Sequence, residues 1–228
     1  MVLPDWPPHI KNAKQLLALG AERLGVPLSD PQIELLLTYL SELTRWNEKI
    51  NLTGIRQEGE IVIKHFLDSL TPLTILAPSE GEKWIDVGTG AGFPGLPLKI
   101  ARPSLQMTLV EVVEKKASFL HHMVGLLNLA EVTIVQDRVE RIVPTLGPDW
   151  EGRFDLLMTR AVAPDLILEK GSRLVRSGGR ILFFQARAEE TDWRERLKGR
   201  PGIGLERIAQ MTLPFTREPR SLILLKVA

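Results

Sequence analysis

The segment DVGTGAGFPG, Asp86–Gly95, has the glycine spacing of a nucleotide-cofactor loop. Read from Gly90, it matches G-x-G-x-x-G, the pattern in which backbone N–H groups at a helix N-terminus bind a pyrophosphate. If the preceding KWIDV (83–87) is a strand, however, the turn starts earlier and its first glycine is Gly88. From Gly88 the pattern fails, because Phe93 occupies the sixth place. The loop is therefore a glycine-rich turn after a strand, but a poor NAD fingerprint.

Two carboxylates lie near this loop, and one of them, Asp86, favours S-adenosylmethionine over NAD as the ligand. Asp86, at the predicted strand end, would repel a pyrophosphate but suits a ligand that carries an ammonium or sulfonium cation. Glu111 ends the next predicted strand about twenty residues later, where an acidic residue accepts hydrogen bonds from ribose hydroxyls in either cofactor class. A solvated strand-end acid is the alternative interpretation of Glu111. The sequence thus predicts a cofactor site that includes Gly88, Gly90 and Glu111.

The absence of cysteine narrows the choice of methyl acceptor. Methylation of pyrimidine C5 needs a cysteine nucleophile. Exocyclic amines usually require an Asp/Asn-Pro-Pro-aromatic loop after the fourth strand, where this chain has TRAVAPD (159–165). The guanine N7 lone pair is unprotonated, so its methylation needs alignment rather than a general base. Arg160 could donate to guanine O6, and a surface ion pair with Asp155 or Asp165 is the alternative.

Five segments together resemble the RsmG family, also called the glucose-inhibited division protein B (GidB) family. They are WNEKINLT (46–53), KHFLDSL (64–70), IDVGTGAGFPGLPLKI (85–100), QDRVE (136–140) and TRAVA (159–163). The resemblance extends from about Leu16 to Lys226. It implies an enzyme that transfers a methyl group from S-adenosyl-L-methionine to N7 of a guanine in 16S ribosomal RNA, either free or within the small ribosomal subunit.

The same resemblance implies a set of site residues. The residues implied to contact the cofactor are Gly88, Phe93, Glu111, Val112, Val113, Val139, Glu140 and Arg160. Arg138 is implied near the substrate, so Arg138 and Arg160 are the expected catalytic residues, and no metal is expected. The family often has a Lys-Gly pair after the fifth strand, whereas this chain has Gln185 and Ala186 there.

Strands and helices must position these residues. The β-rich runs KWIDV, MTLVEV, VTIVQ, FDLLMTR and GRILFFQ alternate with helical segments, which predicts a parallel sheet with helices on both faces. This is the α/β, Rossmann-like sheet of a class I methyltransferase, expected over residues 79–228. GLERIAQMTL and RSLILLKVA are expected to pair as a hairpin. Residues 1–78 have helical periodicity and predict an N-terminal helical subdomain, with Asp30 capping its second helix.

Three sets of residues near the motifs each allow a functional and a structural interpretation. His65 and Asp68 lie three residues apart and could point at the site, or form a helix-surface or interface contact. Trp46 could stack on an unpaired base or belong to the core. Asp137 could accept the adenine amine or cap the following turn.

Composition limits the partners. The net charge is +1, but residues 170–228 hold 13 Lys and Arg against 6 Asp and Glu, which suggests a polyanionic partner or a solvated basic surface. Pro4, Pro7 and Pro8 replace the basic and apolar regions of a secretion signal. We expect a cytoplasmic monomer that binds RNA, with no membrane or DNA partner. The alternatives are a catalytically silent binding protein with this fold and an NAD-dependent oxidoreductase, for which Tyr39 is the only tyrosine.

Overall fold

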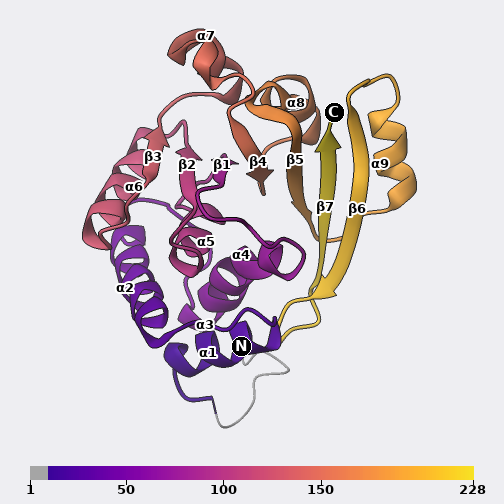
Figure 1. Ribbon diagram of the computed structural model, residues 1–228. Coiled ribbons are helices and arrows are strands. Elements are labelled where there is room, and N and C mark those ends of the chain that lie inside the picture. The colour runs from indigo at the N-terminus through magenta and orange to yellow at the C-terminus, as the bar shows by residue number, and fades with distance from the viewer. Residues whose placement is uncertain (1–9) are drawn as a thin grey trace.

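The computed structural model describes residues 10–228, so the segment that contains Pro4, Pro7 and Pro8 lies outside the described residues. Its centre is a seven-stranded sheet with helices packed on both faces (Figure 1). The strands are β1 (Lys83–Val87), β2 (Gln106–Val110), β3 (Val132–Val135), β4 (Phe154–Thr159), β5 (Val175–Gln185), β6 (Ile203–Thr212) and β7 (Pro219–Val227). Each of the seven strands overlaps a run that the sequence predicts, but β5 begins at Val175, four residues before GRILFFQ.

The strand order in the sheet is β3-β2-β1-β4-β5-β7-β6. Strands β1 to β5 are parallel, so their carboxyl ends meet at one edge. Strand β7 runs antiparallel to β5, and β6 pairs antiparallel with β7, which confirms the predicted hairpin. The direction of winding reverses between β1 and β4, and in open α/β sheets ligands bind at the carboxyl edge beside such a reversal.

The helices are connected to the strands by short loops. They are α1 (Ala13–Arg23), α2 (Asp30–Asn47), α3 (Glu58–Ile61), α4 (Asp68–Leu70), α5 (Gly95–Ala101), α6 (Glu114–Leu126), α7 (Ile142–Leu146), α8 (Pro164–Glu169) and α9 (Glu190–Leu197), and a π-helical turn, Val62–Leu67, joins α3 to α4. Ser29, not Asp30, is the N-cap of α2. Its backbone N–H donates to the side chain of Gln32 in a capping box, which leaves Asp30 as the first helical residue.

Alternating side chains of the strands pack into two hydrophobic clusters, one on each face of the sheet. Trp84 and Met158 belong to the cluster that contains the apolar residues of α1, α2, α5 and α6. Ile85 and Leu157 belong to the other, with residues of α7, α8 and α9. The helices of the first 78 residues therefore share a core with one face of the sheet. A subdomain boundary at residue 78 stays a prediction.

Candidate functional site

The glycine loop between β1 and α5 has a backbone that other residues would strain. Gly88, Gly90 and Gly92 have φ values of 72°, 63° and 102°, in the region that favours glycine. A Cβ on Gly88 would lie 2.6 Å from Val162 Cγ2, whereas a Cβ on Gly90 would meet nothing within 4 Å. The loop backbone is thus packed against Val162 at Gly88 and has free space beside Gly90, where a ligand could approach the backbone.

Asp86 does not reach this open side, so the predicted contact between its carboxylate and a ligand cation is wrong. The side chain is fully buried, and its Oδ2 accepts hydrogen bonds from Thr89 Oγ1 (2.6 Å) and the Gly95 N–H (2.8 Å). Burial raises the pKa of Asp86 to about 6. Because strand residues alternate between faces, Asp86 points beneath the loop and holds the turn into α5.

Glu111 follows β2 and joins two backbone segments at the carboxyl edge. Its Oε2 accepts from the Gly90 N–H (2.9 Å) and its Oε1 accepts from the Val113 N–H (2.8 Å). The residue is only 5% exposed, which excludes the interpretation as a solvated strand end. Each carboxylate oxygen can accept a further hydrogen bond, so Glu111 shapes the glycine loop and still has acceptor capacity.

Two cavities adjoin at this edge, with Gly88, Glu111 and Val112 in the walls of both. The first, of about 250 Å³, is also lined by Val87, Val110, Asp137, Arg138, Val139, Glu140, Val162 and Leu166. The second, of about 360 Å³, is also lined by Leu52, Thr53, His65, Thr89, Gly90, Ala91, Phe93, Val113, Lys116, Arg160 and Ala161. Gly90 and every residue that the family resemblance implies at the site line one of these cavities, whereas Asp86 lines neither.

The two expected catalytic arginines line different cavities. Arg138 lies at the first, with a largely exposed side chain whose nearest acidic partner is Glu140 at 3.9 Å. Arg160 lines the second and is mostly buried. Asp137, in the first cavity, accepts a hydrogen bond from the Arg138 N–H but makes no cap hydrogen bond to the turn Val139–Arg141, so both interpretations of Asp137 stay predictions. The first cavity has exposed apolar surface at its rim, because Val112 is 53% exposed.

Arg160 is held by the helical segment that precedes β1. Its Nη1 donates to Asp68 Oδ2 (3.2 Å) and to the Lys64 carbonyl (3.3 Å), and its Nη2 donates to His65 Nδ1 (3.2 Å). It pairs with neither of the two aspartates proposed as surface partners. The KHFLDSL motif therefore supplies three contacts that fix one arginine at the cavity wall.

Asp68 has a second arginine partner that sequence analysis did not find. Arg220, on β7, donates from Nε to Asp68 Oδ1 (2.6 Å) and from Nη2 to Asp68 Oδ2 (2.9 Å). Asp68 is fully buried, so the two arginines compensate a carboxylate that has no contact with water. The spacing of His65 and Asp68 hinted at a shared face, but nothing in the sequence links either residue to Arg220.

His65 lies inside the second cavity wall, on the π-helical turn. Its ring stacks on Phe93, with centroids 4.7 Å apart and planes at 17°. Burial, and secondarily the charge of Arg160, lowers the pKa of His65 to about 3. His65 is therefore neutral at physiological pH and is not a proton donor for the cavity. Its Nε2 lies 2.7 Å from Thr53 Oγ1.

The loop that carries Thr53 is fixed by Asn47, the last residue of α2. Asn47 Oδ1 accepts from the Leu52 and Thr53 N–H groups, and Asn47 Nδ2 donates to the Thr53 carbonyl (3.0 Å). Beside it, Trp46 packs on Phe119 with centroids 5.4 Å apart. The indole is half-buried and also lines a separate surface pocket with Lys49. Both interpretations of Trp46 therefore remain open.

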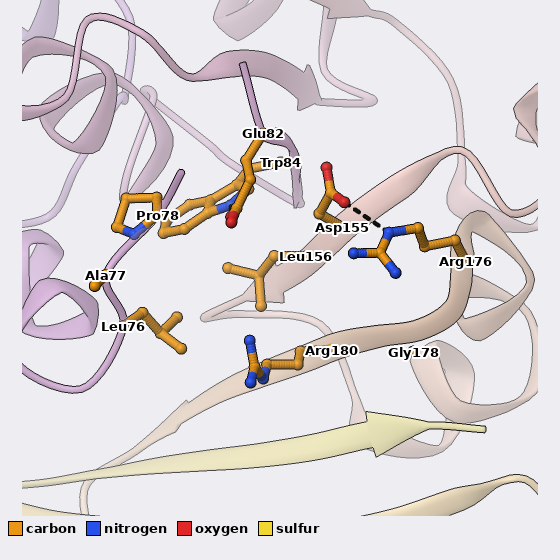
Figure 2. Close-up of a pocket in the computed structure, with 10 residues that line it drawn as sticks. All are labelled: Leu76, Ala77, Pro78, Glu82, Trp84, Asp155, Leu156, Arg176, Gly178 and Arg180. Atoms are coloured by element: carbon orange, nitrogen blue, oxygen red, sulfur yellow. Dashed lines mark hydrogen bonds and ion pairs between the residues drawn. The ribbon is translucent and has the colours of Figure 1, made fainter. Parts of the chain in front are cut away.

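A further pocket lies away from these cavities, at the amino edge of the sheet (Figure 2). It is small, about 50 Å³, and Trp84 and Leu156 contribute to its walls. Asp155 accepts from the Lys83 N–H (2.7 Å) and from Arg176 Nε (2.7 Å), the pair drawn as a dashed line. These contacts tie β1, β4 and β5 together, so we interpret this edge as structural.

The basic surface of α9 is largely neutralised by local acids. Arg194 pairs with Glu190, Arg196 with Asp165, and Lys198 with Glu195. By contrast, neither Lys49 nor Lys116 has an acidic partner within ion-pair distance in the described part of the chain. Within residues 10–228 no helix is long and apolar enough to cross a membrane. The cations without acidic partners thus include Lys116, which lines the second cavity, and Lys49, which lines the separate pocket with Trp46.

Comparisons with known proteins agree on one family. The family described as rRNA small subunit methyltransferase G (GidB) matches residues 32–221. The ribosomal RNA small subunit methyltransferase G of Geobacter sp. (strain M21) is 37% identical over 221 residues, covering 95% of this chain and 98% of the relative. The protein of the same name from Roseiflexus castenholzii is 48% identical over 162 residues, covering 69% of this chain and 67% of the relative.

Solved structures show the same fold at low sequence identity. A SAM-dependent methyltransferase from Aquifex aeolicus has a TM-score of 0.57 at 16% identity and covers 88% of this chain and all of the other. TrmN from Thermus thermophilus has a TM-score of 0.55 at 14% identity, over 71% of this chain and 48% of the other. These similarities confirm the predicted Rossmann-like methyltransferase sheet.

Proposed function

We infer the function from one premise, which is that this chain belongs to the rRNA small subunit methyltransferase G family. The chain is a methyltransferase that uses S-adenosyl-L-methionine and modifies 16S ribosomal RNA. The observation that supports this most directly is the pair of adjoining cavities at the carboxyl edge, joined by the glycine loop and Glu111. We propose further that the acceptor is N7 of a guanine, and that the chain acts as a cytoplasmic monomer, with neither a membrane nor DNA as its partner.

The residues at the edge fit the cofactor. Gly90 leaves space where a side chain would project, and Glu111 has free acceptor capacity for hydroxyl groups. Val112 offers an exposed apolar surface for a flat ring, with Val139 in the same cavity. When bound, the cofactor supplies a methyl group activated by a sulfonium. The second cavity, with Phe93 and Arg160, is where we place the acceptor base and the reactive end of the cofactor.

Methylation of guanine N7 does not need an acid–base residue from this chain. Because guanine N7 carries a lone pair at neutral pH, no residue has to remove a proton from it. The neutral His65 and the buried Asp86 are therefore not required as general bases. The chain's contribution is to align the base, exclude water and donate hydrogen bonds to it, for which Arg160 is the main candidate.

Methyl transfer can be tested directly. The chain is incubated with radiolabelled S-adenosylmethionine and, in separate reactions, with free 16S ribosomal RNA and with isolated small subunits, and the labelled nucleoside is identified and mapped. We expect N7-methylguanosine at a defined position in one of the two substrates. Calorimetry is expected to show micromolar cofactor binding and no comparable binding of NAD. Cofactor binding without transfer to either RNA would favour the catalytically silent alternative.

Glu111→Ala is expected to weaken S-adenosylmethionine binding by about 1–3 kcal/mol, because it removes a buried charged acceptor and frees the Gly90 and Val113 amides. Calorimetry of the variant measures this, and RNA affinity should change little. Glu111→Gln, which keeps one acceptor oxygen, is the matched control and should lose less. A Glu111→Ala variant with wild-type cofactor affinity would limit Glu111 to a structural role.

RNA affinity is expected to depend on the lysines without acidic partners. Changing Lys49 and Lys116 together to alanine should make the plot of log affinity against log salt less steep by about one to two units, because each phosphate contact releases condensed counterions. The ion-paired Arg194, Arg196 and Lys198, changed together, form the control and should alter the slope less. The opposite ranking would place the RNA on α9.

A further inference from the structure

One imidazole ring links Arg160 to Thr53 and fixes the direction of the hydrogen bonds between them. Arg160 Nη2 lies 3.2 Å from His65 Nδ1, and an arginine can only donate, so Nδ1 accepts. In the neutral ring the hydrogen must then sit on Nε2, which donates to Thr53 Oγ1 at 2.7 Å. The low pKa of His65, caused mainly by burial, keeps the ring in this neutral form.

The hydroxyl oxygen of Thr53 is consequently occupied as an acceptor. It receives the His65 N–H and also the Ile55 backbone N–H at 3.1 Å, which together use both of its lone pairs. Within residues 10–228 no hydrogen bond takes up its own hydroxyl hydrogen. Since Thr53 lines the second cavity, a ligand there meets it as a hydrogen-bond donor only.

Arg160, like Thr53, can only donate hydrogen bonds to a ligand in this cavity. Of its five N–H groups, three are used by Asp68, by the Lys64 carbonyl and by His65, which leaves Nε–H and one hydrogen on Nη2. Arg160 and Thr53 bind opposite edges of the same ring and line the same cavity. Asn47 holds the Thr53 backbone through three hydrogen bonds, so its hydroxyl is positioned before any ligand arrives.

We propose that Thr53 donates a hydrogen bond to O6 of the acceptor base and makes the enzyme select guanine over adenine. This inference rests on the proposed function. Adenine also has an N7, so the reacting atom cannot distinguish the two purines. At position 6, guanine has a carbonyl oxygen that can accept two hydrogen bonds, whereas adenine has an amino group whose hydrogens would face donors. Donors of fixed direction therefore favour guanine and oppose adenine.

The test compares Thr53→Val, which removes the hydroxyl at nearly constant shape, with Thr53→Ser, which keeps it. Each variant is assayed on the RNA form that the wild-type chain methylates, with the target base as guanine or as 2-aminopurine, which retains N7 but lacks O6. We expect Thr53→Val to lower kcat/KM on guanine about tenfold or more and to change the rate on 2-aminopurine little. Thr53→Ser should remain within about threefold of wild type on both bases.

The preference for guanine over 2-aminopurine is the decisive readout, because a purely structural defect would lower both rates in proportion. A proportional loss, or a wild-type rate of Thr53→Val on guanine, overturns the inference while the proposed function stands. Absence of N7-methylguanosine with the wild-type chain overturns the proposed function itself, and this inference with it. Cofactor affinity of both variants, measured by calorimetry, should equal that of the wild type.

Discussion

Replacing Arg160 with alanine is expected to slow methyl transfer about a hundredfold or more, equivalent to about 3 kcal/mol, while the fold is retained. Arg160 follows β4 at the carboxyl edge and lines the second cavity, where its remaining donors can hold the acceptor base in line for transfer. The fold should survive because Asp68 keeps both hydrogen bonds from Arg220. Asp68 is then still compensated by a cation.

Single-turnover rates at saturating cofactor isolate this effect from any weakening of cofactor binding. Arg160→Lys is the matched variant: it keeps the charge beside Asp68 but lacks the planar fork, so its loss should be intermediate. Arg138→Ala, at the other cavity, should slow single-turnover transfer less than Arg160→Ala does. A folded Arg160→Ala protein that transfers methyl at the wild-type rate would exclude Arg160 from the mechanism and leave Arg138 as the next candidate.

Asp68→Ala is expected to lower the free energy of unfolding by about 3 kcal/mol, because removing one partner of a buried ion pair leaves the others uncompensated. The side chains of Arg160 and Arg220 are 20% and 17% exposed, so water can relieve only part of this cost. Urea denaturation followed by circular dichroism measures the change.

Asp68→Asn is the control for this second effect, since it preserves the shape and one acceptor oxygen. Its loss of stability should be smaller than that of alanine, yet its transfer rate should also fall, because Arg160 loses a charged anchor. If the alanine variant were within 0.5 kcal/mol of wild type, a typical range for surface substitutions, the buried network would not be a source of stability.

Local patterns predicted those parts of the structure that depend on neighbours in sequence. KWIDV forms β1 with the predicted bounds, and Glu111 lies one residue beyond β2, because apolar runs and turn residues determine strands locally. The direction of a side chain within a strand is harder to predict. The strand-end position of Asp86 predicts a contact with the ligand, but the side chain points beneath the loop and accepts hydrogen bonds from Thr89 and Gly95.

The arginine network could not be predicted because it depends on distant pairings. His65 and Asp68 are close in sequence and share a predicted helical face, but Arg160 contacts them from more than 90 residues away in the sequence. Arg220 reaches Asp68 only because β7 pairs antiparallel with β5. A single sequence does not distinguish a buried arginine from an exposed one. Nothing in the sequence therefore separates Arg220 from the other arginines of the C-terminal third.

The bond between Asp68 and Arg220 spans 152 residues of chain, and this separation affects how the protein reaches its native state. Contacts of high sequence separation form late, because the intervening chain must first be ordered. During synthesis the glycine loop and Glu111 leave the ribosome well before β7. Asp68 can therefore pair with Arg220 only after β7 has also emerged. A truncated product that ends before β7 would lack Arg220 and therefore the second cation of Asp68. The ion-pair network around Asp68 is therefore complete only when β7 has paired with β5.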